Sequence, residues 1–165
     1  EDLLAVTGGR TTRANYNYAV GGYRTDQCLT VWRNNVRGRG FSTLVLDCGV
    51  NSAIQGIPAT SALAWADLQT ILNEAKADGM TVVPLTILPF GSNANWSAPR
   101  QTFITDINSS MTTWCTANSV TCVDTYTAFL GVSPAMNAAY DSGDGLHPNA
   151  AGSALISTLV QAVGP

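Results

Sequence analysis

The sequence predicts an α/β protein in which helices cover both faces of a parallel β-sheet, a three-layer α/β/α sandwich. Strand-like and helix-like segments alternate along the 165 residues, an order typical of a parallel sheet with helical crossovers. The strand-like segments are continuously apolar, which favours strands covered on both faces. Hydrophobic residues make up 45% of the chain and charged residues only 12%, which argues against a disordered chain. Its length fits a single domain over residues 1–165.

Four elements are expected in the first half of the chain. A short strand covers residues 15–20, and a helix over 25–36 follows it. The next strand covers 43–47, around a Leu-Val-Leu run. A helix over 60–78 has apolar residues at helical spacing, and Gly79 stands where a C-cap glycine belongs.

The second half repeats the alternation. Residues 81–88 form another buried strand, and a helix over 101–117 places its apolar residues on one face. A short strand covers 120–124. The last helix covers 148–163, and Pro148 suits its first turn.

The chemically distinctive residues fall where a parallel sheet gathers functional groups, at the carboxyl ends of its strands. Gly22 follows the first predicted strand, Asn51 follows the second, and Asp144 and His147 precede the last helix. A histidine is the usual base that activates a serine, and a carboxylate at its Nδ1 fixes the tautomer. The alternative is an exposed histidine beside a helix N-terminus, with a turn glycine and a loop-capping asparagine at the other two positions.

Three motifs carry a resemblance to a known family. The run Asp-Gly-Leu-His-Pro-Asn at 144–149 resembles the Asp-x-x-His block of the SGNH (GDSL-like) hydrolases. Cys-Gly-Val-Asn at 48–51 resembles their Gly-x-Asn-Asp block, and Asn-Tyr-Ala-Val-Gly-Gly-Tyr-Arg-Thr at 17–25 resembles their glycine block. The motifs occur in the order of the family, and the resemblance extends from about residue 15 to the C-terminus.

The resemblance implies a flavodoxin-like parallel sheet and a serine-dependent carboxylic ester hydrolase. Asp144 would orient His147, the base of a Ser–His–Asp triad, and the Gly22 N–H and Asn51 would bind the oxyanion. The substrate would be a small ester, an acylated carbohydrate or a lipid, and no metal or organic cofactor is expected.

Two other classes of function compete with this one. A non-catalytic binding domain on the same fold stays open. A phosphate-binding domain is disfavoured, because Gly21-Gly22 lacks the P-loop pattern and a nearby lysine.

Two departures from the family matter. Position 52 holds Ser52, where the family has an aspartate that supports the loop. The Gly-Asp-Ser block that carries the nucleophile is also absent. Residues 1–14 are interpreted as the tail of the helix that follows this block. The first, central strand and the serine are therefore expected upstream of Glu1, on a preceding segment or peptide that completes the sheet. Without that segment, residues 1–165 are expected neither to fold alone nor to be active alone.

A rival alignment makes residues 3–6 the first strand and Thr-Gly-Gly at 7–9 a degraded Gly-Asp-Ser. It leaves too few residues for a crossover helix before the glycine block, since parallel strands need a dozen or more connecting residues. Ser52 and Ser142 lie in suitable loops, but neither sits on a strand-to-helix turn of its own, so neither is favoured as the nucleophile.

The four cysteines are expected to form disulfides in an exported protein. Cys115 and Cys122 are the better pair, since a short reversal between a helix and a strand would bring them together. Cys28 and Cys48 both approach the predicted site and form the second candidate pair. The alternative is four buried thiols in a cytosolic protein.

The remaining composition limits the partners. The net charge is −3, and the eight basic residues form no dense patch, which argues against a nucleic-acid partner. No apolar run approaches the roughly 18 residues of a membrane span. A secreted or extracytoplasmic location is expected from the cysteines.

Overall fold

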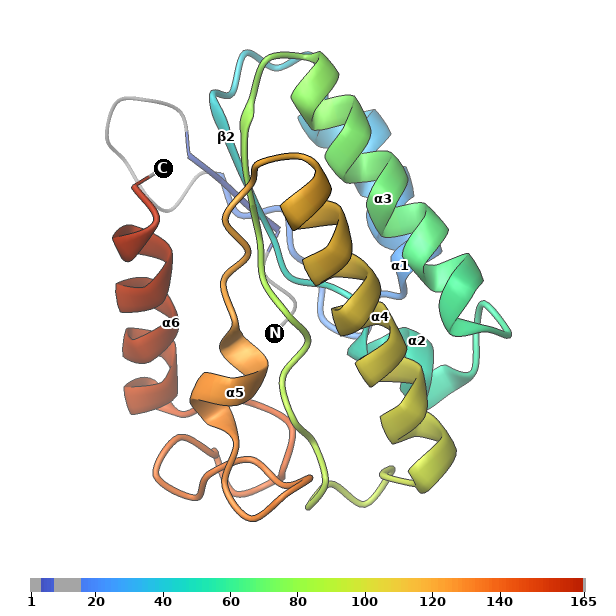
Figure 1. Cartoon of the computed structure of the whole chain (residues 1–165), viewed down its shortest axis with the longest axis vertical. Helices are drawn as coiled ribbons and strands as arrows, with labels where there is room; N and C mark the ends of the chain where they lie inside the picture. Colours follow the sequence, from blue (N-terminus) through green and yellow to red (C-terminus); the bar gives the residue numbers. More distant parts are fainter. Residues whose placement is uncertain (1–3, 8–15, 165) are drawn as a thin grey trace.

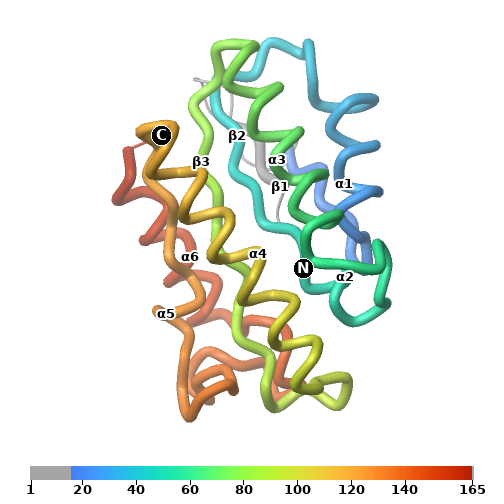
Figure 2. The backbone as a smooth tube through the Cα atoms, turned by 45° about the vertical axis from the view of Figure 1, so that its right-hand side comes forward, coloured from blue at the N-terminus to red at the C-terminus, as the bar shows by residue number. Residues whose placement is uncertain are grey.

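The sheet has three strands, β1 (Leu4–Thr7), β2 (Thr43–Leu46) and β3 (Thr81–Pro84), in the order β1-β2-β3. In this computed structural model, which describes residues 4–7 and 16–164, β2 and β3 are parallel and β1 is antiparallel to β2. A parallel bridge between Leu85 and Val123 extends the sheet beyond β3. Figure 2 shows β2 and β3 side by side between the helices.

Helices lie on both sides of this sheet (Figure 1). They are α1 (Thr25–Val31), continued by a π-helical turn at Trp32–Val36, then α2 (Val50–Gln55), α3 (Ser61–Ala77), α4 (Ala98–Ala117), α5 (Thr125–Phe129) and α6 (Ala150–Ala162). α1, α3 and α4 cover one face, and α5 and α6 cover the other. The three-layer α/β/α sandwich predicted from the sequence is therefore confirmed.

The alternation of β2 divides the core into two layers. Leu44 and Leu46 are fully buried in the layer that contains the α3 residues Leu68 and Leu72. Val45, one residue out of phase, packs in the second layer, with Ile156 of α6 among its members. A strand with buried residues on both faces reads as one continuous apolar run, which is why the sequence revealed it.

Most predicted helices and strands are found, with shifted ends. The helix expected at 60–78 is α3, with Thr60 as its N-cap. The helix expected at 101–117 begins earlier, at Ala98, with Ser97 as its N-cap. The strand expected at 120–124 is reduced to the single bridge at Val123. The strand expected at 15–20 is reduced, over its described residues 16–20, to a single bridge residue, Asn17.

The interpretation of residues 1–14 as the tail of a helix is wrong for Leu4–Thr7, which form β1. The rival alignment placed a strand here, but as the parallel first strand of the sheet, whereas β1 runs antiparallel to β2 with Leu4 opposite Leu46. The rest of the segment lies outside the described residues. A free edge of β2 presents unpaired N–H and C=O groups, and four extended residues are enough to satisfy them.

Both expected disulfides are present. Cys115 and Cys122 join the end of α4 to the following segment, with 5.9 Å between their Cα atoms. Cys28 of α1 is bonded to Cys48 at the end of β2, with a Cα separation of 7.1 Å, at the upper limit for such a bond. Within the described part of the chain, no helix combines the length and the apolar character that a membrane crossing requires.

Candidate active site

The loop over residues 141–149 presents Asp144 and His147, and its own hydrogen bonds fix its shape. The Asp141 carboxylate accepts hydrogen bonds from the Gly143 and Gly145 N–H groups, at 2.8 and 3.0 Å. Asn149 caps α6 by accepting the Gly152 N–H at 3.0 Å. A short polar stretch therefore becomes a defined turn that runs directly into a helix.

Within this turn, Asp144 holds His147 at both its ring and its backbone. Asp144 Oδ2 lies 2.6 Å from His147 Nδ1, and Oδ1 accepts the His147 and Leu146 N–H groups at 2.8 and 2.9 Å. The His147 side chain, followed by these N–H donors, lowers the pKa of Asp144 well below its usual range. The carboxylate is ionised at neutral pH and favours the tautomer in which Nδ1 carries the proton. Nε2 is then free to accept a proton.

The two predicted oxyanion donors stand opposite this pair. Gly22 lies in the turn before α1 and has a φ of +82°, a conformation that suits glycine. Asn51 lies in the first turn of α2, after Gly49. A Cβ at Gly49 would stand 2.5 Å from the Cδ1 of Ile87, so glycine lets α2 start close to the exit of β3.

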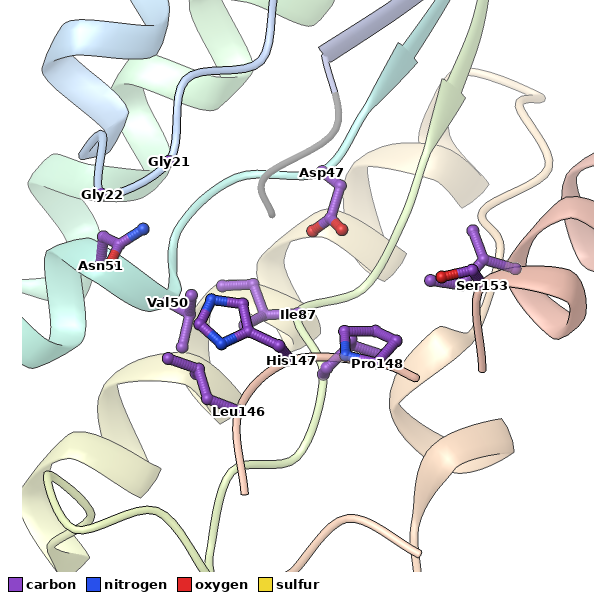
Figure 3. Close-up of a pocket in the computed structure, with 12 residues that line it drawn as sticks. Gly21, Gly22, Asp47, Val50, Asn51, Ile87, Leu146, His147, Pro148 and Ser153 are labelled. Carbon is purple, nitrogen blue, oxygen red and sulfur yellow. The ribbon is translucent and has the colours of Figure 1, made fainter. Parts of the chain in front are cut away.

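A pocket of about 520 Å³ brings these residues together. It is lined by Gly21, Gly22, Asp47, Val50, Asn51, Ile87, Leu88, Leu146, His147, Pro148, Ser153 and Ile156. Figure 3 shows the His147 ring in this pocket, with the Asn51 amide and Gly22 to one side. Gly22, Asn51 and His147, which come from three separate segments, thus line one cavity, while the catalytic roles assigned to them remain predictions.

Sequence reasoning missed Asp47, the one acidic residue among the described residues that line the pocket. Its carboxylate points into the pocket in Figure 3. Its place at the end of a predicted strand, just before the Cys-Gly-Val-Asn run, was the available signal. No lysine or arginine occurs among the described lining residues.

The serines considered as alternative nucleophiles are engaged elsewhere. Ser52 is fully buried and accepts the Thr25 N–H at 3.0 Å. Ser142 donates to Asp144 Oδ1 at 3.2 Å and is not among the described pocket residues. Ser153 lines the pocket from α6, but in Figure 3 it lies beyond Pro148 from the imidazole ring. Among the described residues, no group of three or more His, Cys, Asp or Glu side chains is placed to hold a metal ion.

The three-layer sandwich and the His–Asp pair beside its pocket suit a hydrolase, and the comparison with known families shows the same class. Residues 1–155 match the model of the GDSL-like lipase/acylhydrolase family, and the chain belongs to that family. No curated protein matches the chain in sequence.

Solved structures share the fold at low sequence identity. A Bacteroides fragilis protein assigned as an acylhydrolase has a TM-score of 0.77 and 24% identity, over 86% of this chain and 70% of its own. A GDSL-like lipase from Bacteroides thetaiotaomicron has a TM-score of 0.78 and 23% identity, over 86% of this chain and 71% of its own. An acetylxylan esterase from Geobacillus stearothermophilus has a TM-score of 0.74 and 17% identity, over 91% of this chain and 72% of its own.

Proposed function

We propose that this domain hydrolyses carboxylic esters through a Ser–His–Asp triad in which His147 is the base, Asp144 orients it, and the serine belongs to a segment preceding residue 1. The observation that carries the proposal is the 2.6 Å contact between Asp144 Oδ2 and His147 Nδ1, beside a pocket that Gly22 and Asn51 also line. Unrelated loop residues would have no reason to converge on one cavity from three separate segments of the chain.

The chemistry proceeds in two balanced halves. His147 Nε2 takes the serine proton as the serine oxygen attacks the ester carbonyl, and the Gly22 N–H and the Asn51 amide stabilise the resulting oxyanion. The C–O bond to the leaving alcohol then breaks, and His147 returns the proton to that alcohol. Water, activated by the same nitrogen, attacks the acyl-enzyme and releases the acid and the serine.

The pocket lining supports neutral esters as substrates. Most of the described lining side chains are apolar and none of them is basic, so an anionic ester would meet no counter-charge among the described lining residues. A lipid ester or an acylated carbohydrate fits this lining, and the fold neighbours include a GDSL-like lipase and an acetylxylan esterase. The two disulfides support an exported protein.

A fluorophosphonate probe and p-nitrophenyl acetate test the proposal together, on the longest form of the protein that its gene encodes. The expected result is one labelled serine in a Gly-Asp-Ser sequence, and ester turnover that His147→Ala lowers by several orders of magnitude. Asp144→Asn keeps the size of the side chain and should also slow turnover. Asp106→Asn, an exposed carboxylate on α4 bonded to Ser61, is the matched control and should not.

A non-catalytic binding domain is the second candidate, because the described serines do not stand beside the imidazole as a nucleophile would. It predicts no probe labelling and no turnover, together with saturable binding of an ester or acylated sugar. Near-full activity in His147→Ala would overturn the triad itself.

A further inference from the structure

A buried polar chain joins the turn that bears Gly22 to the helix that bears Asn51. Ser52 Oγ accepts the Thr25 N–H at 3.0 Å and lies 3.3 Å from Thr25 Oγ1. Thr25 Oγ1 in turn lies 2.8 Å from Asp67 Oδ2 on α3. Ser52 and Thr25 are fully buried, so no solvent can replace these bonds.

The direction of each hydrogen bond follows from the groups involved. The Asp67 carboxylate only accepts, so the Thr25 hydroxyl donates to it. The Thr25 oxygen then accepts the Ser52 hydroxyl proton, and the Ser52 oxygen accepts the Thr25 N–H. Burial raises the pKa of Asp67, and the Thr25 hydroxyl bond opposes that rise. Each donor in this series of three hydrogen bonds thus has an acceptor, and the series ends at the Asp67 carboxylate.

The Thr25 N–H is a group that the helix cannot satisfy by itself. Thr25 is the first residue of α1, and the first N–H groups of a helix have no acceptor within it. A side chain near the start of a helix usually caps such groups, but here Ser52 does so from 27 residues away. The cap is therefore also a bond between two separate segments.

These segments are the ones that carry the proposed oxyanion donors. Gly22 stands three residues before Thr25, and Asn51 directly precedes Ser52. A second bond of the same kind runs from Gln55 Nε2 to the Gly22 carbonyl at 2.8 Å. Donors that act on one oxyanion must be held to within about 0.5 Å of their working positions.

We infer that Ser52 is a positioning residue, which with Thr25 and Asp67 sets the placement of the Gly22 N–H relative to the Asn51 amide. The effect of Ser52 on turnover rests on the proposed ester hydrolysis, whereas its effect on the positions of Gly22 and Asn51 does not. In the family motif that this chain resembles, position 52 is acidic. Here the neutral Ser52 hydroxyl accepts the Thr25 N–H, and the acidic group is Asp67 on α3.

Three substitutions separate this role from a general contribution to the core. Ser52→Ala removes the acceptor of the Thr25 N–H and introduces no side chain larger than the serine. Thr25→Val removes the hydroxyl that links Ser52 to Asp67 at nearly constant volume, whereas Thr25→Ser keeps it. Thr125→Val is the control, since Thr125 is an equally buried threonine on α5.

Amide hydrogen exchange and ¹⁵N NMR on the chain test the geometry without any substrate. In Ser52→Ala the Thr25 amide hydrogen should exchange with solvent at least 10-fold faster than in the wild type. The NMR signals of the Gly22 backbone amide and the Asn51 side-chain amide should also shift. Thr25→Val should shift the same two signals, and Thr25→Ser should leave them near their wild-type positions. Thr125→Val should lower the melting temperature and move neither signal. Unchanged Gly22 and Asn51 signals in Ser52→Ala would overturn the inference.

Turnover of p-nitrophenyl acetate provides the second arm, on the form that contains the serine. Ser52→Ala should lower kcat by about 10- to 100-fold with KM within about threefold, since misplacement by about 1 Å costs up to about 100-fold. Equal losses of kcat in Ser52→Ala and Thr125→Val would contradict a positioning role. Absence of turnover in the wild type would instead refute the proposed function, and the NMR arm would still decide whether Ser52 sets the two donors.

Discussion

Gly145, between the two residues of the acid–base pair, is the position where one added methyl group should do the most damage. Its φ is +72°, and a Cβ there would stand 2.5 Å from the backbone nitrogen of Asn93 and 2.6 Å from the carbonyl carbon of Ser92. The two loops approach this closely because Asn93 Nδ2 donates to the Asp144 carbonyl at 2.8 Å. The obstacle is the peptide group between Ser92 and Asn93, which cannot rotate away as a side chain would.

The cost of Gly145→Ala has two parts. Holding an L-residue in the left-handed region costs about 1–2 kcal/mol. Forcing a methyl group into a packed contact costs about 1–3 kcal/mol more. The expected loss is therefore about 2–5 kcal/mol, a large share of the roughly 5–15 kcal/mol that holds a domain of this kind together. Relief of the clash must also move the turn that pairs Asp144 with His147.

Urea denaturation of Gly145→Ala and Gly79→Ala isolates the clash. Gly79 has a φ of +80°, and no atom lies within 4 Å of its added Cβ, so that variant should lose only about 1–2 kcal/mol. Ester turnover should fall in Gly145→Ala and persist in Gly79→Ala. Stability losses that agree within about 0.5 kcal/mol would refute the claim that the two loops are in backbone contact at Gly145.

Three further outcomes are expected. Asn108 holds the backbone at the exit of β3 by two hydrogen bonds, of 2.7 and 3.0 Å, so Asn108→Ala should lose about 2–4 kcal/mol in urea denaturation, and a loss below about 0.5 kcal/mol would contradict this. Replacing Cys28 and Cys48 together by serine should lower the free energy of unfolding by about 3 kcal/mol, the chain-entropy value for a loop of this size, and an unchanged melting temperature would show that the bridge is absent. Because the His147 side chain and neighbouring N–H groups lower the pKa of Asp144, its contribution to stability is complete above the unfolded pKa of about 4 and is lost as the pH falls toward the lower folded value. The stability difference between wild type and Asp144→Asn should accordingly shrink below about pH 4, and a pH-independent difference would exclude this linkage.

The sequence predicted those elements whose signal lies within the element itself. The apolar spacing of α3 and the continuous apolar run of β2 each record the burial of one segment, and both were found close to their predicted ends. For β1 the short apolar run at residues 3–6 allowed a strand, but nothing in it indicated the partner or the direction of pairing. Four residues that pair antiparallel with β2 depend on an edge that another part of the chain leaves open, and no pattern within residues 4–7 reports that edge.

The site shows the same division. Asp144 and His147 are three residues apart and bonded within one turn, so a local motif was sufficient. Gly22 and Asn51 meet only through the topology of the sheet, and the family resemblance supplied that information. Asp47 was missed because its direction depends on strand alternation, which a continuously apolar run does not reveal.

The two flanks of the pocket are built independently, and this limits how a nucleophile can reach it. On one side, Ser52 and the Cys28–Cys48 disulfide tie the donor segments together; on the other, the 141–149 turn is fixed by its own bonds and by α6. Between them lies the end of β2, whose two edges are paired with β1 and β3. A serine carried on a strand that pairs directly with β2 in parallel would therefore need the edge that β1 holds, because β3 already occupies the other. Such a strand and the antiparallel pairing of Leu4–Thr7 are mutually exclusive arrangements of the same edge of β2.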